Sequence, residues 1–371
     1  MMWNRRALLG AAALAAGSAG FPARARSAAQ TWPAAGPDLT GTPAAPVVIP
    51  APDEPVGLLS DTVISLWPEG RVPGADGVTA RRLVLERGSP AAHDRAVLHV
   101  SRPILEVFRP ERPNGTAVIV APGGGYVRLA LDKEGAGAAR RLTAAGVTVF
   151  VLHYRLPGDG WAAGYDAPVQ DIQRAVRLVR AQASSRDVDP GRIGVMGFSA
   201  GGHLAAAALT RFDDALYAPV DEADALSARP DFACLVYALM SVGSGPGQYP
   251  GPDAEARQPL DQRVRPGLAP TFLVHAADDR TVPVAHSLTM FAALRAAEVP
   301  AELHVYQEGG HGFGFILPAD RPASHWPEAF EAWVRRSGFS GRPDEGRTAD
   351  LGPRPQHVKS RRWTTVDNRL R

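Results

Sequence analysis

Short runs of apolar, β-branched residues recur along the chain after Gly115, and segments of helical length separate several of them. Such runs are typical of strands that are buried on both faces of a sheet. The predicted strands are Ala117–Val120, Val147–Leu152, Ile193–Met196, Phe232–Val236, Thr271–Val274 and Leu303–Tyr306. The predicted helices are Glu134–Ala145, Ala167–Ala183, Ala200–Thr210, Val284–Ala297 and Pro327–Ser337. This alternation predicts an α/β fold with a mostly parallel central sheet and helices on both faces.

Three shorter β-prone runs precede the alternating region. We expect Arg81–Leu85, Ala96–Pro103 and Ile104–Phe108 to start a sheet. Proline and glycine punctuate Leu66–Asp76, which predicts an ordered loop. One later interval interrupts the alternation, because Ser241–Leu268 is rich in glycine, proline, aspartate and glutamine. This interval is either a surface loop or part of a cap over a site.

The N-terminus has the pattern of an export signal, which we assign to residues 1–29. Met1–Arg6 is basic, Ala7–Ala16 is mildly apolar, and small residues follow that offer a cleavage site. The pair Arg5-Arg6, followed by Ala-Leu-Leu, resembles the twin-arginine export signal. The apolar stretch is too short to span a bilayer as a stable membrane anchor. We therefore expect an exported protein, periplasmic or secreted.

Composition divides the rest of the chain into three parts. Residues 30–56 are rich in proline and alanine, which predicts an extended linker. Residues 57–340 form one catalytic domain in this interpretation. Residues 341–371 are polar, with scattered arginines and few apolar residues, and predict a disordered tail.

Charge and cysteine content narrow the function classes. A formal net charge of +2 over 371 residues gives no electrostatic reason to expect a nucleic-acid partner. The single cysteine, Cys234, excludes an internal disulfide, and its apolar surroundings predict a buried small hydrophobe. The chain carries no H-E-x-x-H motif, EF-hand loop or G-K-[ST] phosphate loop, so we expect no metal and no nucleotide cofactor. The oligomeric state is not indicated.

The segment Gly197-Phe198-Ser199-Ala200-Gly201 fits the pattern G-x-S-x-G. It lies between a predicted strand and a predicted helix, which is the context that a nucleophile elbow requires. Glycine two residues before and after the serine lets the strand and the helix approach each other without Cβ clashes. Ser199 then lies at a helix N-terminus, where free N–H groups favour developing negative charge. The pattern predicts Ser199 as a nucleophile.

A serine hydroxyl needs a base that accepts its proton and an acid that orients the base. The loop after the fifth predicted strand carries the adjacent aspartates Asp278 and Asp279, and the glycine-rich loop after the sixth carries His311. Because the carboxyl ends of parallel strands meet at one edge of an open sheet, Ser199, His311 and one of these aspartates should lie together. Three further histidines are expected to have structural roles: His153, His203 and His275.

The oxyanion that forms during acyl transfer needs N–H donors that face the serine. Ala121–Tyr126, with the sequence APGGGY, comes directly after the first predicted strand of the alternating region. Its glycines have no side chains that would keep the N–H groups away from the site. We expect the donors to be the N–H groups of Gly124, Gly125 and Ala200.

Together these motifs resemble the α/β-hydrolases of the acetyl-esterase and acetylxylan-esterase-like group, which includes xylanase-associated esterases. The matching stretches span most of residues 60–340: LWPEGRVPGAD at Leu66–Asp76, APGGGY at Ala121–Tyr126, HYRLP at His153–Pro157, APVQDIQRAVRLVR from Ala167, RIGVMGFSAGGHLA ending at Ala205, DDRTVP at Asp278–Pro283 and GGHGF at Gly309–Phe313. In the family the acid is the aspartate four residues before the proline of D-x-x-V-P, which is Asp279 here. Pro122 stands where the family's oxyanion loop often has histidine.

The resemblance implies hydrolysis of carbohydrate-bound acyl esters, commonly acetyl, without a cofactor. The substrate partner is then a small-molecule or polysaccharide ester. We expect a two-step acyl transfer in which Ser199 is the nucleophile, His311 is the base and Asp279 orients it. Tyr126 and Trp161 are candidates for lining a sugar subsite.

Other functions can use the same serine, acid and base. A peptidase of the prolyl-oligopeptidase type shares the elbow, but it usually has a large N-terminal domain, for which only Gln30–Pro110 is available here. A lipase favours a long apolar cap, whereas Ser241–Leu268 is polar. A general carboxylesterase of small esters and a non-catalytic polysaccharide-binding protein are the remaining alternatives.

Overall fold

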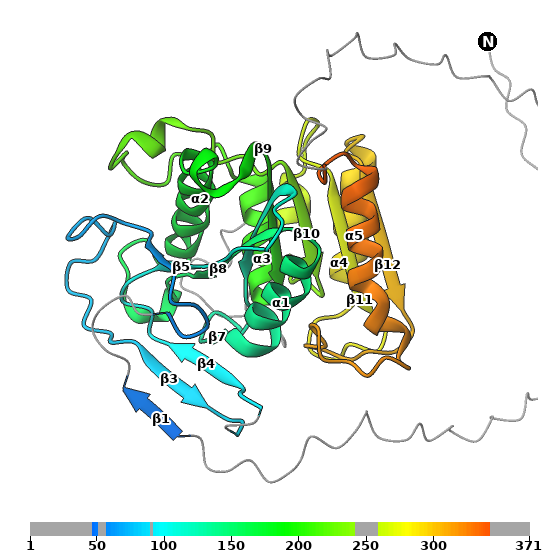
Figure 1. Cartoon of the computed structure of the whole chain (residues 1–371), viewed down its shortest axis with the longest axis horizontal. Coiled ribbons are helices and arrows are strands. Elements are labelled where there is room, and N and C mark those ends of the chain that lie inside the picture. Colours follow the sequence, from blue (N-terminus) through cyan, green and yellow to red (C-terminus); the bar gives the residue numbers. More distant parts are fainter. Residues whose placement is uncertain (1–46, 51–56, 90–91, 242–258, 342–371) are drawn as a thin grey trace, which may run out of the picture. The chain divides into compact units, whose positions relative to one another are not determined.

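The computed structural model describes residues 47–50, 57–89, 92–241 and 259–341, with the backbone alone for residues 47–50. All of these lie in one of the chain's two compact units, Thr42–Arg371. The described strands form one sheet of eight strands and one of four (Figure 1). The larger sheet carries the functional residues predicted above.

The larger sheet has the strand order β12-β11-β10-β9-β6-β8-β5-β2. The strands from β12 to β8 in this order pair in parallel, and β5 and β2 are antiparallel additions at one edge. The bounds are β2 Val63–Ser65, β5 Ile104–Phe108, β6 Gly115–Ala121, β8 Thr148–His153, β9 Val188–Phe198, β10 Phe232–Val236, β11 Thr271–Ala276 and β12 Ala301–Tyr306. The prediction of a mostly parallel sheet built from these strands is confirmed.

The α-helices of the described residues each coincide with a predicted helix. Their bounds are α1 Gly137–Ala144, α2 Asp166–Ala181, α3 Ala200–Thr210, α4 Ala285–Ala296 and α5 Trp326–Arg336. Helices α2, α3 and α4 pack along one face of the sheet (Figure 1). Helices α1 and α5 cover the other face, where Arg141 of α1 pairs with Glu331 of α5 at 2.6 Å. A π-helical turn, Leu131–Ala136, leads into α1.

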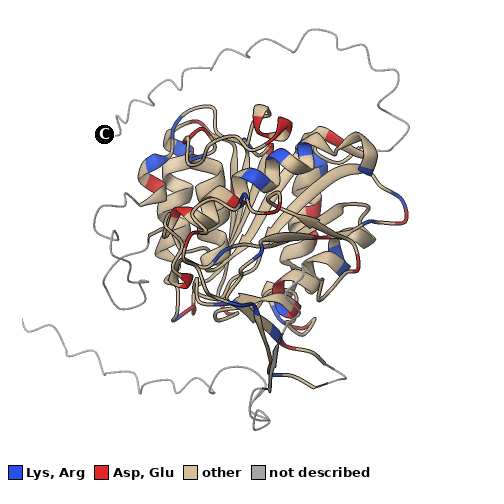
Figure 2. Ribbon diagram, turned by 90° about the vertical axis from the view of Figure 1, so that its left-hand side faces the viewer, with Lys and Arg blue, Asp and Glu red and all other residues tan. Residues whose placement is uncertain are grey.

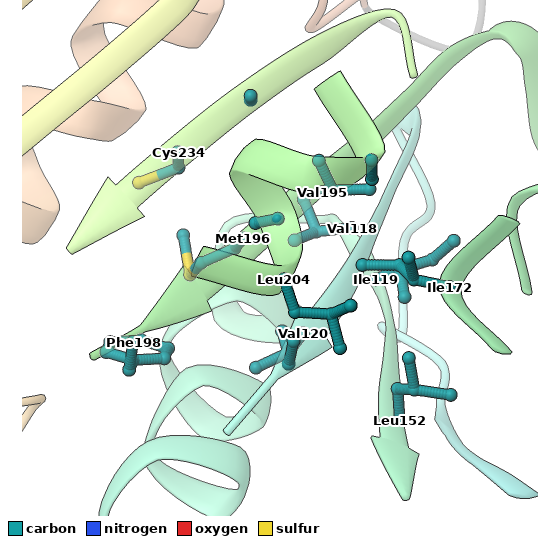
Figure 3. Packing of buried hydrophobic residues seen from close by; sticks show 14 of the residues in the cluster. Val118, Ile119, Val120, Leu152, Ile172, Val195, Met196, Phe198, Leu204 and Cys234 are labelled. Carbon is teal, nitrogen blue, oxygen red and sulfur yellow. The ribbon is translucent and has the colours of Figure 1, made fainter. Parts of the chain in front are cut away.

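The central strands are mostly apolar, since helices cover both faces of the sheet. All residues of β8, β10 and β11 are buried. Figure 3 shows Val118 of β6 and Val195 of β9 in the same cluster as Ile172 of α2 and Leu204 of α3. Burial on two faces explains the continuous apolar runs, which do not alternate as they would in a half-exposed sheet. Cys234 lies in this core as predicted, and burial raises the pKa of its thiol.

The smaller sheet corrects one expectation, the extended linker at residues 47–50. Its strand order is β1-β3-β4-β7, with bounds β1 Val47–Pro50, β3 Leu83–Glu86, β4 Arg95–Leu98 and β7 Leu129–Ala130. The three runs predicted to start a sheet are all strands: β3 and β4 pair with each other in the smaller sheet, and β5 joins the main sheet. Burial gives the reason: β5 is buried on both faces, whereas β3 is half exposed. Residues 47–50, predicted to lie in an extended linker, form a strand antiparallel to β3.

Several predictions fall outside the described residues. These are the export signal at 1–29, the rest of the linker at 30–56, and the tail at 341–371 apart from Gly341. The choice between a loop and a cap for Ser241–Leu268 rests on residues 242–258, which also lie outside. The described part of this interval includes a short 3₁₀ turn, Leu260–Arg263. In the described ranges, no helix combines the length and apolarity that crossing a membrane requires.

Basic and acidic residues are interspersed along the fold (Figure 2). The pair Arg155–Asp171 is fully buried, with the Nη2 to Oδ1 distance at 2.9 Å. Trp67 Nε1 donates to the same carboxylate at 2.8 Å, and Arg155 Nη1 donates to the Pro73 carbonyl at 2.6 Å. These bonds fasten Leu66–Asp76, the predicted ordered loop, to α2.

We predict that Asp171→Ala lowers the free energy of unfolding by about 3–5 kcal/mol, because it leaves the Arg155 guanidinium buried without its counter-charge. Urea unfolding followed by circular dichroism measures this change. Asp213→Ala is the control, because it removes an exposed pair with Arg265, whose Nη2 to Oδ1 distance is 2.7 Å. Its expected cost is below about 1 kcal/mol. Equal losses in the two variants would contradict the structural role of the buried pair.

Candidate active site

Ser199 occupies the turn between β9 and α3 with a strained backbone. Its φ of 53° and ψ of −116° are unfavourable for a residue that carries a Cβ. Glycine is required at both flanking positions. A Cβ on Gly197 would lie 2.0 Å from the Gly201 carbonyl oxygen, and a Cβ on Gly201 would lie 2.1 Å from the Ala121 carbonyl oxygen. The turn therefore forms because strand, helix and neighbouring loop approach to backbone contact.

The structure brings three of the predicted residues into one hydrogen-bonded chain. His311 Nε2 lies 2.9 Å from Ser199 Oγ, and His311 Nδ1 lies 2.7 Å from Asp279 Oδ2. Ser199 follows β9, Asp279 follows β11 and His311 follows β12, all at the carboxyl edge of the parallel strands. An imidazole between a hydroxyl and a carboxylate is the arrangement that activates a serine for attack on a carbonyl.

Asp279 is held as an anion by several donors. Its Oδ1 accepts hydrogen bonds from the N–H groups of Thr281 and Val282, both at 2.9 Å. Burial by itself raises the pKa of the carboxyl, but hydrogen bonds from His275, His311 and the Val282 N–H outweigh burial and hold the pKa well below its usual range. A carboxylate that is charged at neutral pH fixes the orientation of His311.

The sequence motifs left open which of two adjacent aspartates orients His311. In the structure the two side chains have different partners. Asp279 contacts His311, whereas Asp278 Oδ1 accepts from the Gly310 N–H at 2.8 Å. Asp278 thus fastens the loop that carries His311.

The three histidines that were expected to have structural roles each contact another residue of the fold. His153 lies 2.8 Å from Glu106, and His203 Nδ1 lies 2.8 Å from the Tyr126 hydroxyl. His275 contacts Ser287 and the Val282 carbonyl. In addition, His275 Nε2 lies 3.3 Å from Asp279 Oδ2, a contact that sequence reasoning missed.

The APGGGY loop lies directly against Ser199. A Cβ on Gly123 would lie 3.1 Å from Ser199 Cβ. Gly124 and Gly125 have φ values of 132° and 70°, which suit glycine. In the described part of the chain, the N–H groups of Gly124, Gly125 and Ala200 donate to no acceptor. They match the requirement for oxyanion donors, and their role remains a prediction.

The two aromatic residues predicted to line a sugar subsite are buried. Tyr126 is 4% exposed and packs edge-on against Tyr154 and Tyr165. Trp161 is 5% exposed, and its ring lies 5.0 Å from the Arg155 guanidinium. A stacking platform for a sugar needs an exposed ring face, so the burial of Tyr126 and Trp161 does not support this assignment.

Sequence reasoning also missed two buried residues behind the site, Glu134 and Tyr237. The Glu134 carboxyl accepts from the Gly123 N–H, and the Tyr237 ring packs 5.1 Å from the His311 ring. The available signal for Glu134 was an acidic residue at the start of the predicted helix, a pattern that is equally typical of a favourable charge at a helix N-terminus.

A strained serine at the edge of a parallel sheet, with its histidine and aspartate in hydrogen-bonding order, defines the architecture of an α/β-hydrolase of the serine hydrolase type. The predicted fold class is confirmed. A sequence model described as the prolyl oligopeptidase family matches residues 139–337, a range that includes Ser199, Asp279 and His311. The chain belongs to this family.

Three relatives bear on the chemistry. An acetylxylan esterase of Xylanibacter ruminicola is 34% identical over 223 residues, which cover 56% of this chain and 43% of the relative. Endo-1,4-beta-xylanase B of Butyrivibrio fibrisolvens is 31% identical over 204 residues, which cover 53% of this chain and 32% of the relative. An acetyl ester-xyloside bifunctional hydrolase from Caldicellulosiruptor lactoaceticus is structurally similar, with a TM-score of 0.60 and 30% identity over 77% of this chain and all of the relative.

The match to these proteins confirms the resemblance to acetylxylan-esterase-like α/β-hydrolases. The chain spans less than half the length of the two curated relatives. The activities of those proteins are therefore grounds for a proposal.

We predict that Asp279→Asn lowers stability at neutral pH and that the difference from the wild type shrinks in acid. A carboxyl with a lowered folded-state pKa stabilises the fold above the unfolded-state pKa, about 4, and this contribution is lost as the pH falls through the folded-state value. Urea unfolding at pH 7 and pH 3 measures the two differences. Asp278→Asn, which affects a single exposed hydrogen bond, serves as the control. A deficit of Asp279→Asn that stays constant with pH would be the contrary result.

Proposed function

We propose that this protein is a serine esterase that hydrolyses acyl esters of carbohydrates, with acetyl as the acyl group and acetylated xylan or xylo-oligosaccharides as substrates. The observation that carries the proposal is the chain Ser199–His311–Asp279, with contacts of 2.9 and 2.7 Å. The substrate class rests on the names of two relatives, an acetylxylan esterase and an acetyl ester-xyloside hydrolase.

Acylation begins when Ser199 Oγ attacks the ester carbonyl carbon while His311 Nε2 accepts the hydroxyl proton. The carbonyl oxygen becomes an oxyanion, which the N–H groups of Gly124, Gly125 and Ala200 stabilise in this mechanism. Collapse of the intermediate breaks the bond to the sugar oxygen, and His311 returns its proton to that oxygen. The products are the free sugar hydroxyl and an acyl-serine.

Deacylation repeats these steps with water as the nucleophile. His311 accepts a proton from the water, the hydroxide attacks the acyl-serine, and Ser199 leaves with the proton that His311 returns. Asp279 stays ionised in both halves and stabilises the imidazolium. The reaction consumes one water per acetate and needs neither a metal nor an organic cofactor.

We predict that the wild-type protein releases acetate from acetylated xylan and hydrolyses 4-nitrophenyl acetate, and that Ser199→Ala lowers kcat by about 10³-fold or more. Acetate assay and absorbance at matched protein concentration measure the two rates. Ser185→Ala is the control, because its hydroxyl makes one exposed bond to the Gln182 carbonyl. Near-normal turnover by Ser199→Ala would reject Ser199 as the nucleophile.

The substrate panel separates the remaining functions. Hydrolysis of 4-nitrophenyl acetate and butyrate without acetate release from xylan or xylo-oligosaccharides indicates a general carboxylesterase. Cleavage of proline-containing dipeptide substrates, without ester turnover, indicates the peptidase alternative that the family name brings forward.

We also propose that the protein is exported through the twin-arginine route, on the strength of its first residues alone. Replacing Arg5 and Arg6 together by lysine should retain the protein inside the cell, since the pair is the recognised feature of that signal. Immunoblots of periplasmic and cytoplasmic fractions of an expressing bacterium measure the distribution, with Arg81→Lys as the matched control. Export of the double variant at the wild-type level would refute the proposal.

A further inference from the structure

Glu134 is a buried carboxylic acid that bonds to two different segments of the active site. It lies in the π-helical turn Leu131–Ala136 and is 5% exposed. Its Oε2 accepts from the Gly123 N–H at 2.5 Å, and its Oε1 accepts from the Tyr237 hydroxyl at 2.9 Å. Neither partner is a cation, so this carboxyl is held by neutral donors.

Tyr237 extends the connection to the loop that carries His311. Its hydroxyl oxygen accepts from the Gly314 N–H at 3.0 Å, and its ring packs edge-on against His311 with 5.1 Å between ring centroids. The residue directly follows β10, is fully buried and has a φ of 37°, which is strained for a residue with a Cβ. Strain of this kind persists only where the surrounding contacts enforce it.

Gly123 joins this pair to the oxyanion loop. Its carbonyl accepts from the Ala130 N–H at 2.9 Å and its N–H donates to Glu134, so both polar groups of Gly123 are bonded within the protein. The N–H of Gly124 belongs to the same peptide group as that carbonyl. A hydrogen bond to the carbonyl both fixes the plane of this peptide and polarises its N–H.

A contribution to the stability of the fold does not by itself explain why a carboxyl is buried here with neutral partners. Burial raises the pKa of Glu134, while hydrogen bonds from Gly123 and Tyr237 and the nearby His311 and Lys133 lower it, and burial prevails. A buried acid is costly compared with an apolar side chain of similar volume. Its two hydrogen bonds set the spacing between the two loops on either side of Ser199, which an apolar side chain cannot do.

We propose that Glu134 and Tyr237 are positioning residues that hold the oxyanion loop and the His311 loop at a fixed spacing around Ser199. The inference rests on the proposed esterase function. Neither side chain touches the substrate in this assignment; each acts through the main chain of Gly123 or through the orientation of His311.

The test uses the full chain with Glu134→Gln, Tyr237→Phe and the double variant. Both single changes keep the side-chain volume. Glu134→Gln places an amide nitrogen beside the Tyr237 hydroxyl, or beside the Gly123 N–H, and so leaves one proton without an acceptor. Tyr237→Phe keeps the ring against His311 and removes only the bridging hydroxyl.

Glu106→Gln is the matched control. Glu106 is also fully buried and accepts from backbone N–H groups, those of Leu58, Leu59 and Ser60, but it lies on β5, which β6 and β8 separate from β9 in the sheet. It therefore reports the effect of changing a buried carboxylate that does not contact the active-site loops.

Two assays are run well below the melting temperature of each variant. The first gives kcat and KM on 4-nitrophenyl acetate, and the second gives the rate at which a fluorophosphonate probe labels Ser199. We expect each single variant to lower kcat and labelling by about 10- to 100-fold with KM changed by less than about threefold, because transition-state contacts are lost while binding is not. The double variant should be no worse than about the poorer single one, since the residues act as a unit.

The inference is overturned if both single variants keep kcat within about threefold of the wild type, if Glu106→Gln loses as much, or if the double variant shows the product of the single losses. Should Glu134→Gln fail to fold, Tyr237→Phe decides the outcome alone. The labelling assay separates this test from the test of the proposed function. If the wild type is labelled at Ser199 but hydrolyses no carbohydrate ester, the proposed substrate class is refuted. The labelling rates of the variants still decide the positioning role in that case.

Discussion

The close approach of β9, α3 and the APGGGY loop is the constraint on which the rest of the site depends. At Gly197 and Gly201 the backbones come so near that an added Cβ would lie about 2 Å from a carbonyl oxygen. This contact forces Ser199 into positive φ and directs the start of α3 towards the glycine loop. The same close packing places Gly123 of the APGGGY loop against the serine, where an added Cβ would lie 3.1 Å from Ser199 Cβ.

Parallel strand order supplies the remaining groups. Because β9, β10, β11 and β12 are consecutive neighbours, the loops that follow them gather at one edge. Asp279 and His311 come from sequence positions far from Ser199, yet each needs only the loop after its strand to reach the site. Fixed N–H donors on Asp279 keep the charge in place, so the electrostatic part of the site is set by the fold before any ligand arrives.

Sequence alone could predict the parts that depend on local pattern. The parallel strands are short continuous apolar runs separated by segments of helical length, and the elbow, the glycine loop and His311 follow from motifs at the ends of those strands. It could not predict that β3 and β4 leave the main sheet, because pairing partners depend on burial that a single strand does not encode. Nor could it predict the burial of Tyr126 and Trp161, since an aromatic residue in a loop has the same sequence pattern whether its ring is packed or exposed.

Buried carboxylates in this fold differ in what compensates their charge. Asp171 faces the Arg155 guanidinium, and Glu106 faces His153 and three backbone N–H groups. Within the described ranges, Glu134 forms no ion pair and has an N–H and a phenol as its partners. Asp171 and Glu106 each hold one segment of the chain against another, through a charged partner or several N–H donors, and they lie away from Ser199. Of the three carboxylates, Glu134 has the least compensation for its charge. It lies between the two loops that flank Ser199, where precise spacing affects the reaction rather than the stability of the fold.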